Sequence, residues 1–419
     1  MEARGLNQRP ESPAQVAGAT YDNPVIAERL LDLLLILLFL VYLGEGWRNG
    51  FARSISTIAG IVAGGLAAFF LIPLVAQIIP SPFWRTVVTI AVGIAFLGGG
   101  HAAGNAIGRA IRGRVAETAL SGPDRLFGAL ANLITSALVT ALIAGSVGAL
   151  GIPFLSTAIS GSWVLRGIET ITPAPVDAAL ARLRSIVLEA GLPSIGEALG
   201  GIATSPGVPN VDTGTDALSV AGQSVVRISG NAYACGQNQS GTGFVIAPDR
   251  IVTNAHVVAG VPEPVVEAPN GQALDGRVVY FDPNDDLAIV AVLGLKVVPL
   301  DLASTLGVGD KAVVEGYPFG GPFTTGPAEV LAVSTEQIEN IYGTDTSPRE
   351  VYSLAAKVNP GNSGGPLLTT GGDVAGIVFA RSASDDELGY AMTNAELTPV
   401  VDRAAKLATA IEPGSCIRG

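Results

Sequence analysis

The sequence is poor in the side chains that bind metal ions. Its 419 residues include only two cysteines and two histidines, and the histidines, His101 and His256, lie far apart in the chain. A structural zinc site needs four such ligands. We therefore expect no metal site and no cofactor.

Positive charge is scarce in the second half of the chain. Residues 215–419 hold 23 Asp and Glu against 11 Lys and Arg, which accounts for the whole net charge of −12, while residues 1–214 hold 13 of each sign. An acidic domain of this kind argues against nucleic acid as a partner.

Charges are almost absent from four apolar segments of the first half. The segments cover residues 30–44, 54–79, 86–108 and 126–150. A bilayer core is about 30 Å thick, which such lengths can cross with some tilt. We predict an all-α transmembrane domain of four spans over residues 25–150, in contact with the lipid bilayer, after an N-terminal tail (1–24). The tail lacks an apolar signal region, so no removable signal peptide is expected.

Arginines are unevenly distributed between the turns that join these spans. The first and third turns hold most of them, and the second turn holds only Arg85; the richer set is Arg48, Arg53, Arg109, Arg112, Arg114 and Arg125. Positive residues favour the cytoplasmic side. We therefore expect both termini, and the second half of the chain, outside the cytoplasm.

Polar and small residues within the spans suggest how the helices pack. Gly60 recurs at Gly64, and Gly100 recurs at Gly104 and Gly108, a spacing that lets helices approach closely in lipid. We interpret it as packing within one bundle, with self-association through this domain left open. Asp32 should lie near an interface or face the bundle. For His101 and Asn105, hydrogen bonds between helices are favoured over a proton or ion path.

A linker over residues 151–214 joins the two halves. Apolar residues at helical spacing predict a helix over 175–192. Residues 200–214 are rich in Gly and Pro, so we expect a loop and the domain boundary there.

Three motifs in the second half carry the chemistry. Residues 253–258 read Thr-Asn-Ala-His-Val-Val, residues 284–289 read Asn-Asp-Asp-Leu-Ala-Ile, and residues 358–366 read Val-Asn-Pro-Gly-Asn-Ser-Gly-Gly-Pro. A serine hydroxyl needs a neighbouring base in order to attack a carbonyl. The order of the motifs matches a His-Asp-Ser triad.

The triad assignment gives each residue a role. Ser363 would be the nucleophile, His256 the general base, and Asp286 the group that orients the imidazole. Asp285 competes for that third role, and we choose Asp286 because it directly precedes the strand-like Leu-Ala-Ile run. The backbone N–H groups of Gly361 and Ser363 would form the oxyanion hole.

These motifs resemble those of trypsin/chymotrypsin-type serine proteases of the bacterial kind. Residues 240–246, Ser-Gly-Thr-Gly-Phe-Val-Ile, resemble the strand before the histidine in the bacterial high-temperature-requirement proteases. The resemblance implies an all-β chymotrypsin-like double β-barrel over residues 215–419. Those proteases also carry a PDZ domain, for which too few residues remain after Thr398.

The same resemblance implies a substrate pocket. Lys357 would lie near the base of the S1 pocket, and Phe379, Ala380 and Arg381 would form one wall. No aspartate occupies the base, so cleavage after Arg or Lys is not favoured.

The four-span region resembles the colicin V production protein family. Its combination with a trypsin-like domain resembles the actinobacterial membrane-anchored periplasmic serine protease linked to acid resistance. This implies an extracytoplasmic serine endopeptidase that cleaves protein or peptide substrates of the cell envelope through an acyl-enzyme, acts in envelope stress or acid resistance, and cuts itself within residues 203–215. The alternatives are an inactive protease fold used for sensing and a membrane scaffold.

Both cysteines, Cys235 and Cys416, lie in the protease-like half. In an oxidising compartment two such residues are expected to form a disulfide, which would tie the C-terminal tail to the start of the domain. Two separate thiols are the alternative.

Overall fold

The computed structural model describes residues 24–78, 82–116, 121–148, 152–173, 175–177, 179–182, 193–196, 199–232 and 237–417. Predictions for other residues, including most of the N-terminal tail, residues 183–192 of the linker helix, and Cys235, lie outside this set and stay predictions.

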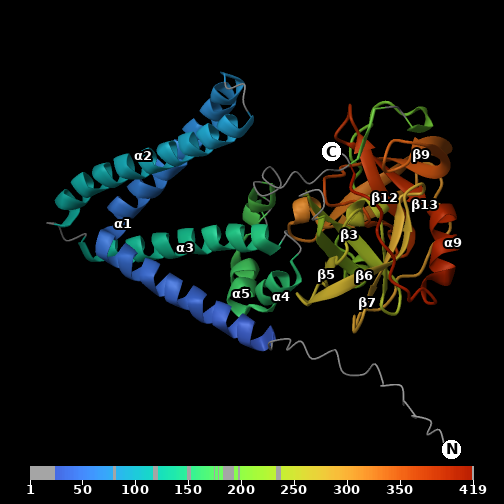
Figure 1. The fold of residues 1–419 in the computed structure, drawn as a ribbon, viewed down its shortest axis with the longest axis horizontal. Coiled ribbons are helices and arrows are strands. Elements are labelled where there is room, and N and C mark those ends of the chain that lie inside the picture. Colours follow the sequence, from blue (N-terminus) through green and yellow to red (C-terminus); the bar gives the residue numbers. More distant parts are fainter. Residues whose placement is uncertain are drawn as a thin grey trace, which may run out of the picture.

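The N-terminal region is helical. Its helices are α1 (Pro24–Ile78), α2 (Pro82–Ala116), α3 (Ser121–Gly148), α4 (Pro153–Gly161) and α5 (Trp163–Ile171). Figure 1 shows two arms, in which the first half of α1 lies along α3 and the second half lies along α2. Two described stretches, Glu28–Ile72 and Ser121–Gly148, are long and apolar enough to cross a membrane.

The arms meet at a kink in α1. Gly50 has φ 72° and ψ 166°, which turns the chain within a single helix. Asp124 of α3 caps the second half of α1, because its Oδ1 accepts a hydrogen bond from Ala52 N at 3.0 Å. A Cβ on Gly50 would lie 1.9 Å from Asp124 Oδ2, so the bend requires glycine. The predicted turn between the first two spans is thus corrected to a kink.

Glycines bring α1 and α2 into backbone contact. A Cβ on Gly60 would lie 2.2 Å from Gly100 O, and one on Gly104 would lie 2.2 Å from Ser56 O. The predicted close packing within one bundle is confirmed. Arg53 Nε also donates to Asn105 Oδ1 at 2.7 Å, which confirms an interhelical hydrogen bond at Asn105.

Asp32 joins the start of α1 to α5. Its Oδ1 accepts hydrogen bonds from Ser162 Oγ at 2.5 Å and from Val164 N at 3.2 Å, at the N-terminus of α5. Asp32 is 5% exposed and faces the bundle, as predicted. Beyond these helices, Arg166 reaches the β region, where a Cβ on Gly271 would lie 3.5 Å from Arg166 Cδ.

The second half is β-rich and contains a closed barrel. Its six strands, in order around the barrel, are β2 (Val225–Ala232), β3 (Gln237–Ala247), β4 (Arg250–Thr253), β7 (Leu287–Val292), β6 (Ala273–Asp282) and β5 (Val265–Glu267). All six residues of β7 are buried. The short helices α7 (Asp216–Gly222) and α8 (Ala255–Val258) lie before β2 and after β4.

A seven-stranded sheet follows. Its order is β1 (Ser194–Ile195), β12 (Val374–Ser382), β11 (Pro366–Thr369), β8 (Lys311–Gly316), β9 (Thr324–Glu339), β10 (Thr346–Ala356) and β13 (Leu388–Thr393). β12 also pairs with β13. The remaining elements are η1 (Leu199–Gly201), η2 (Pro318–Gly320) and α9 (Asn394–Ala404).

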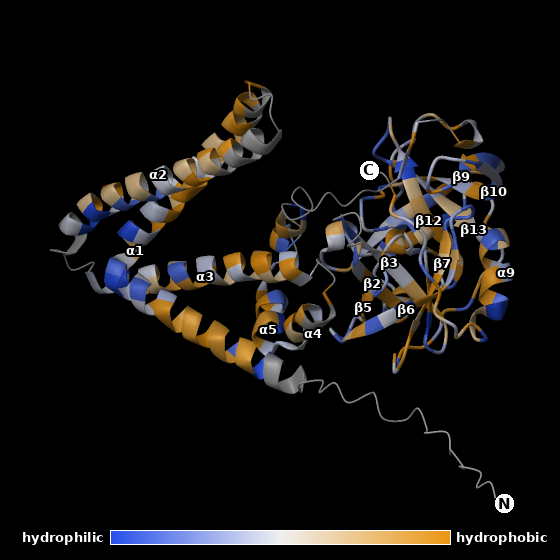
Figure 2. Ribbon diagram, viewed as in Figure 1, coloured by the Kyte–Doolittle hydropathy of each residue, from blue (hydrophilic) through white to orange (hydrophobic). Residues whose placement is uncertain are grey.

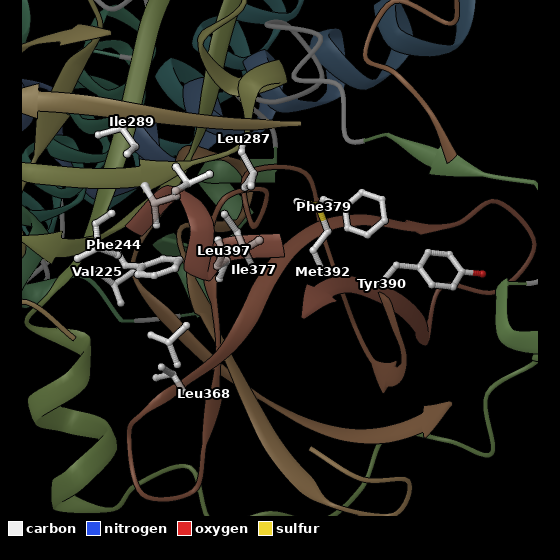
Figure 3. Packing of buried hydrophobic residues seen from close by; sticks show 14 of the residues in the cluster. Val225, Phe244, Leu287, Ile289, Leu368, Ile377, Phe379, Tyr390, Met392 and Leu397 are labelled. Carbon is white, nitrogen blue, oxygen red and sulfur yellow. The ribbon is translucent and has the colours of Figure 1, made fainter. Parts of the chain in front are cut away.

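One hydrophobic core joins the barrel to the sheet. Phe244 and Leu287 of the barrel pack in the same buried cluster as Leu368, Ile377 and Met392 of the sheet (Figure 3). The predicted triad residues come from both units, because His256 and Asp286 lie beside strands β4 and β7 of the barrel and Ser363 lies between β10 and β11 of the sheet.

Candidate active site

His256 lies in α8, directly after β4. β4 is held between β3 and β7, so the short helix starts from a fixed strand. The buried Asn254 at its N-terminus donates through Nδ2 to Asp286 O at 2.9 Å. The imidazole of His256 is itself buried, with 5% of the residue exposed.

Asp286 binds His256 with both carboxylate oxygens. Oδ1 accepts from His256 N at 2.9 Å, and Oδ2 lies 2.8 Å from His256 Nδ1. An ionised carboxylate only accepts hydrogen bonds, so Nδ1 carries the proton and Nε2 keeps its lone pair. This is the arrangement that a general base requires.

Asp285 occupies a different environment. It is half-buried, and its N–H donates to Asp282 Oδ1 at 3.3 Å. Burial and the Asp282 charge raise the pKa of its carboxyl. The structure thus brings Asp286, and not Asp285, to His256.

Ser363 lies in the loop between β10 and β11 and is buried. The next residue, Gly364, packs on the histidine side, because a Cβ there would lie 2.2 Å from Thr253 Oγ1 and 3.1 Å from Asn254 N. Among the described residues, neither Ser363 Oγ nor His256 Nε2 has a hydrogen-bond partner. Unpaired buried polar atoms need an explanation, and in proteases without substrate the catalytic hydrogen bond is often long.

In the nucleophile loop, each carbonyl from Pro360 to Ser363 accepts a hydrogen bond. Four bonds hold them: Phe319 N to Pro360 O at 2.5 Å, Thr242 Oγ1 to Gly361 O at 2.6 Å, Gly365 N to Asn362 O at 2.9 Å and Thr242 N to Ser363 O at 2.8 Å. In a planar trans peptide the N–H points away from the C=O. The N–H groups of Gly361 and Ser363 are therefore turned outward, and within the described residues neither makes a hydrogen bond.

Two buried charged residues lie behind the site. Arg349 of β10 is 1% exposed, donates through Nη2 to Glu339 O at 2.6 Å, and lies over the Phe379 ring. Burial lowers the pKa of its guanidinium, against the charges of Asp286 and Asp285. Arg349 thus places a positive charge near the Asp286 carboxylate.

Glu315 of β8 is the second buried residue with an ionisable side chain. Its Oε1 accepts a hydrogen bond from Thr325 Oγ1 at 3.4 Å, and its Oε2 has no hydrogen-bond partner within the described part of the chain. Burial raises the pKa of the Glu315 carboxyl to about 7, against the effect of the Thr325 bond. Its backbone supports the nucleophile loop, since a Cβ on Gly365 would lie 2.4 Å from Glu315 O.

The predicted pocket residues are not all on one surface. Lys357 is exposed, and Arg381 is half-buried and pairs with Asp386 at 3.1 Å. Ala380 is buried, and Phe379 turns its side chain into the core (Figure 3). The side chain of Phe379 thus belongs to the core cluster, and the predicted pocket stays a prediction.

The C-terminal tail packs on the barrel next to Cys416. Gly260 N donates to Pro413 O at 3.0 Å, and a Cβ on Gly260 would lie 2.9 Å from Cys416 Sγ. Cys235 lies outside the described residues, in the connection between β2 and β3. One barrel strand, β2, comes before Cys235 in the sequence.

Thr242, Phe319, Arg349 and Glu315 were not predicted from the sequence. Thr242 belongs to the Ser-Gly-Thr-Gly run that carried the family resemblance, so this motif could have drawn attention to it. The other three stand in no recognisable motif.

Comparisons with known proteins agree with this geometry. A model of the trypsin-like peptidase domain matches residues 241–377, and a model of colicin V production protein matches residues 31–173. Serine protease Rv3671c of Mycobacterium tuberculosis is 32% identical over 396 residues, which cover 92% of this chain and 98% of that protein. The chain belongs to this family of serine proteases.

Similarity is also found to a solved structure and to shorter stretches of other proteases. The crystal structure of the active form of the Rv3671c protease covers 54% of this chain and 100% of that chain, at 34% identity and a TM-score of 0.50. The putative serine protease HhoA of Synechocystis is 39% identical over 159 residues, which cover 36% of this chain and 39% of that protein.

Proposed function

We propose that this protease is a membrane-anchored serine endopeptidase that acts outside the cytoplasm, with His256, Asp286 and Ser363 as its triad. The observation that carries the proposal is that Asp286 binds His256 through both of its carboxylate oxygens. It fixes the tautomer in which Nε2 can take the serine proton.

Catalysis would proceed in two steps. Ser363 Oγ attacks the scissile carbonyl while His256 Nε2 takes its proton, and the imidazolium then protonates the leaving amine. Water, deprotonated by His256, hydrolyses the acyl-enzyme. The outward N–H groups of Gly361 and Ser363 would bind the oxyanion in both steps.

The fold supports finer features of the proposal. The pairing of β12 with β13 would close the second sheet and give the double β-barrel of a chymotrypsin-like domain. The two arms of α1 with α2 and α3 correspond to four membrane spans. The arms meet where Arg53, Arg112 and Asp124 lie, so the positive-inside rule would place this junction in the cytoplasm and the protease domain outside.

Two covalent events belong to the same proposal. Self-cleavage would occur within residues 203–215, a segment without helix or strand and with many exposed residues. A disulfide would join Cys235 to Cys416, which is supported by the packing of the C-terminal tail on Gly260. A role in envelope stress or acid resistance rests on the family resemblance alone.

An active-site probe tests the proposal. A fluorophosphonate should label the wild-type chain, and Ser363→Ala should abolish both labelling and peptidase activity while the protein stays folded. An unlabelled and inactive wild type would favour the inactive sensing module or the scaffold instead, and labelling that persists in Ser363→Ala would mean that another residue is the nucleophile.

A further inference from the structure

Two residues outside the nucleophile loop hold its carbonyl groups. Thr242 lies on β3 of the barrel and Phe319 lies in η2, yet together they bind three of the four loop carbonyls described above. Gly361, between them, has φ +92° and no side chain to hold this conformation. Its orientation must therefore come from these outside contacts.

Thr242 uses every polar atom it has. Its N–H donates to Ser363 O, and its O accepts from Thr253 Oγ1 at 2.7 Å. Its hydroxyl accepts from Tyr317 N at 3.0 Å and donates to Gly361 O at 2.6 Å. A hydroxyl has one proton, so the bond from Tyr317 commits that proton to Gly361 O.

η2 fixes the peptide on the other side of Gly361. Phe319 has φ +59°, which is rare for a residue with a bulky side chain. In this conformation its N–H reaches Pro360 O. The linker supports η2, because Arg182 lies over the Phe319 ring and a Cβ on Gly321 would lie 2.4 Å from Ala181 Cβ.

We infer that Thr242 is a positioning residue of the oxyanion hole, an inference that rests on the proposed protease function. Its hydroxyl holds the Gly361 carbonyl, and η2 holds the Pro360 carbonyl. The Pro360–Gly361 peptide, whose carbonyl η2 holds, carries the Gly361 N–H, and the Thr242 hydroxyl holds the next peptide, Gly361–Asn362. Fixing both peptides on either side of Gly361 would keep its N–H directed at the oxyanion.

Thr242→Val and Thr242→Ser form a matched pair for the test. Valine keeps the shape and loses the hydroxyl, so kcat should fall about 10²-fold, as when one oxyanion donor is removed, with KM nearly unchanged. Affinity for a peptide boronate, which mimics the tetrahedral intermediate, should fall by the same factor. Serine keeps the hydroxyl and should restore both.

The outcomes separate the inference from the proposed function. A folded Thr242→Val protein with wild-type kcat would overturn the inference, as would equal losses in both variants. If Thr242→Val lowers the unfolding temperature, kcat is measured per probe-labelled site, so that loss of folded protein does not imitate loss of catalysis. A wild type that is neither labelled by the probe nor active would instead overturn the function itself.

A separate observation concerns the linker strand β1. It pairs with β12 in parallel, and Arg381 N and Ala383 N donate to Pro193 O at 3.2 Å and to Ile195 O at 3.0 Å. The same edge of β12 begins at the nucleophile loop, where Gly364 N donates to Val378 O at 2.8 Å. β1 therefore pairs with the edge of β12 that continues from the nucleophile loop.

The strand is anchored on its C-terminal side. Leu199 is buried in the core shared by the barrel and the sheet, and its carbonyl accepts from Ser353 Oγ at 2.8 Å. Gly200 N donates to Glu336 Oε1 at 3.0 Å. These contacts hold residues 193–196 against β12.

We propose that residues 193–196 form an autoinhibitory strap. An extended peptide binds beside an edge strand through main-chain hydrogen bonds, and the strap already uses the N–H groups of Arg381 and Ala383. A substrate that pairs with this edge must displace the strap, so the linker would lower the affinity for substrate. This proposal also rests on the proposed function.

A reversible cross-link tests the strap. Ser194 and Arg381 are register partners, so Ser194→Cys with Arg381→Cys should form a disulfide that raises KM at least 10-fold and is reversed by reductant. The two single variants, treated identically, control for Arg381 and for the natural cysteines. Ser353→Ala, which frees the Leu199 carbonyl, should lower KM. A cross-linked enzyme with the KM of its reduced form would overturn the strap, while the fluorophosphonate test remains independent of it.

Discussion

The helical region exposes many of its apolar side chains, whereas the β region buries them. Leu37, Val41 and Phe69 of α1 are 51%, 62% and 63% exposed, whereas every residue of β7 is buried. Figure 2 shows hydrophobic colour along much of α1 and α3. Outward apolar surface of this extent marks an interaction surface, and the colicin V production match makes lipid the natural partner.

The two regions also hold together by different contacts. Between α1 and α2, glycines allow backbone to touch backbone, as lipid-embedded helices require because lipid gives them little hydrophobic drive to associate. In the β region, large side chains from two sheets interlock. A change in one region should therefore leave the other intact, and the predictions below test that independence.

Asp286→Asn should have the largest effect. An amide cannot hold His256 in the required tautomer, and the corresponding change in chymotrypsin-type enzymes lowers kcat by about 10⁴. Peptidase assays should give that loss with the helical region unchanged. Asp285→Asn is the matched control and should change kcat less than about twofold; the reverse ranking would mean that the third triad member is misassigned.

Residues that stand in a local motif could be identified from the sequence. Each of the three motifs surrounds its own residue, so His256, Asp286 and Ser363 could be proposed as a triad without knowing the fold. Thr242 and Phe319 could not be assigned their positions, because their partners in the nucleophile loop come from distant parts of the chain. Gly50 was missed for the same reason, since its kink depends on Asp124 of another helix.

The direction of the Phe379 side chain could not be predicted for a different physical reason. In a strand with one solvated face, alternation tells which side chains point outward. Eight of the nine residues of β12 are buried, on both faces, so the pattern does not reveal where Phe379 points. The uneven distribution of arginines predicted on which side of the membrane each turn lies. Hydropathy did not distinguish the kink in α1 from a turn between two helices.

Gly100→Leu should damage the helical region alone. A Cβ at Gly100 would lie 2.2 Å from Gly60 O, so α1 and α2 must separate, at a cost of about 3 kcal/mol. Gly99→Leu is the control, because no atom lies within 4 Å of a Cβ there. All three tryptophans, Trp47, Trp84 and Trp163, lie in the first half.

Tryptophan fluorescence therefore reports the unfolding of the helical region in detergent, and fluorophosphonate labelling reports the protease. Gly100→Leu should lower the fluorescence midpoint and leave labelling unchanged. Equal losses in both signals, or equal effects of the two leucines, would contradict the independence of the regions.

Glu315→Gln should have the smallest effect, and it should act on the β region alone. Burial raises the pKa of Glu315 from 4.5 to about 7, so the folded state keeps a proton that the unfolded state has lost. The free energy of unfolding is then highest below pH 4.5, falls as pH rises to about 7, and stays low above it. The glutamine has no proton to lose, so at pH 8 it should be more stable than wild type by roughly 2 to 3 kcal/mol. Midpoints of thermal inactivation at pH 5 and pH 8 give the measurement, with the exposed Glu263→Gln as control. The expected result is a gain at pH 8 with an unchanged tryptophan midpoint. If the wild-type midpoint does not drop from pH 5 to pH 8, relative to that of Glu315→Gln, then Glu315 is ionised at both pH values.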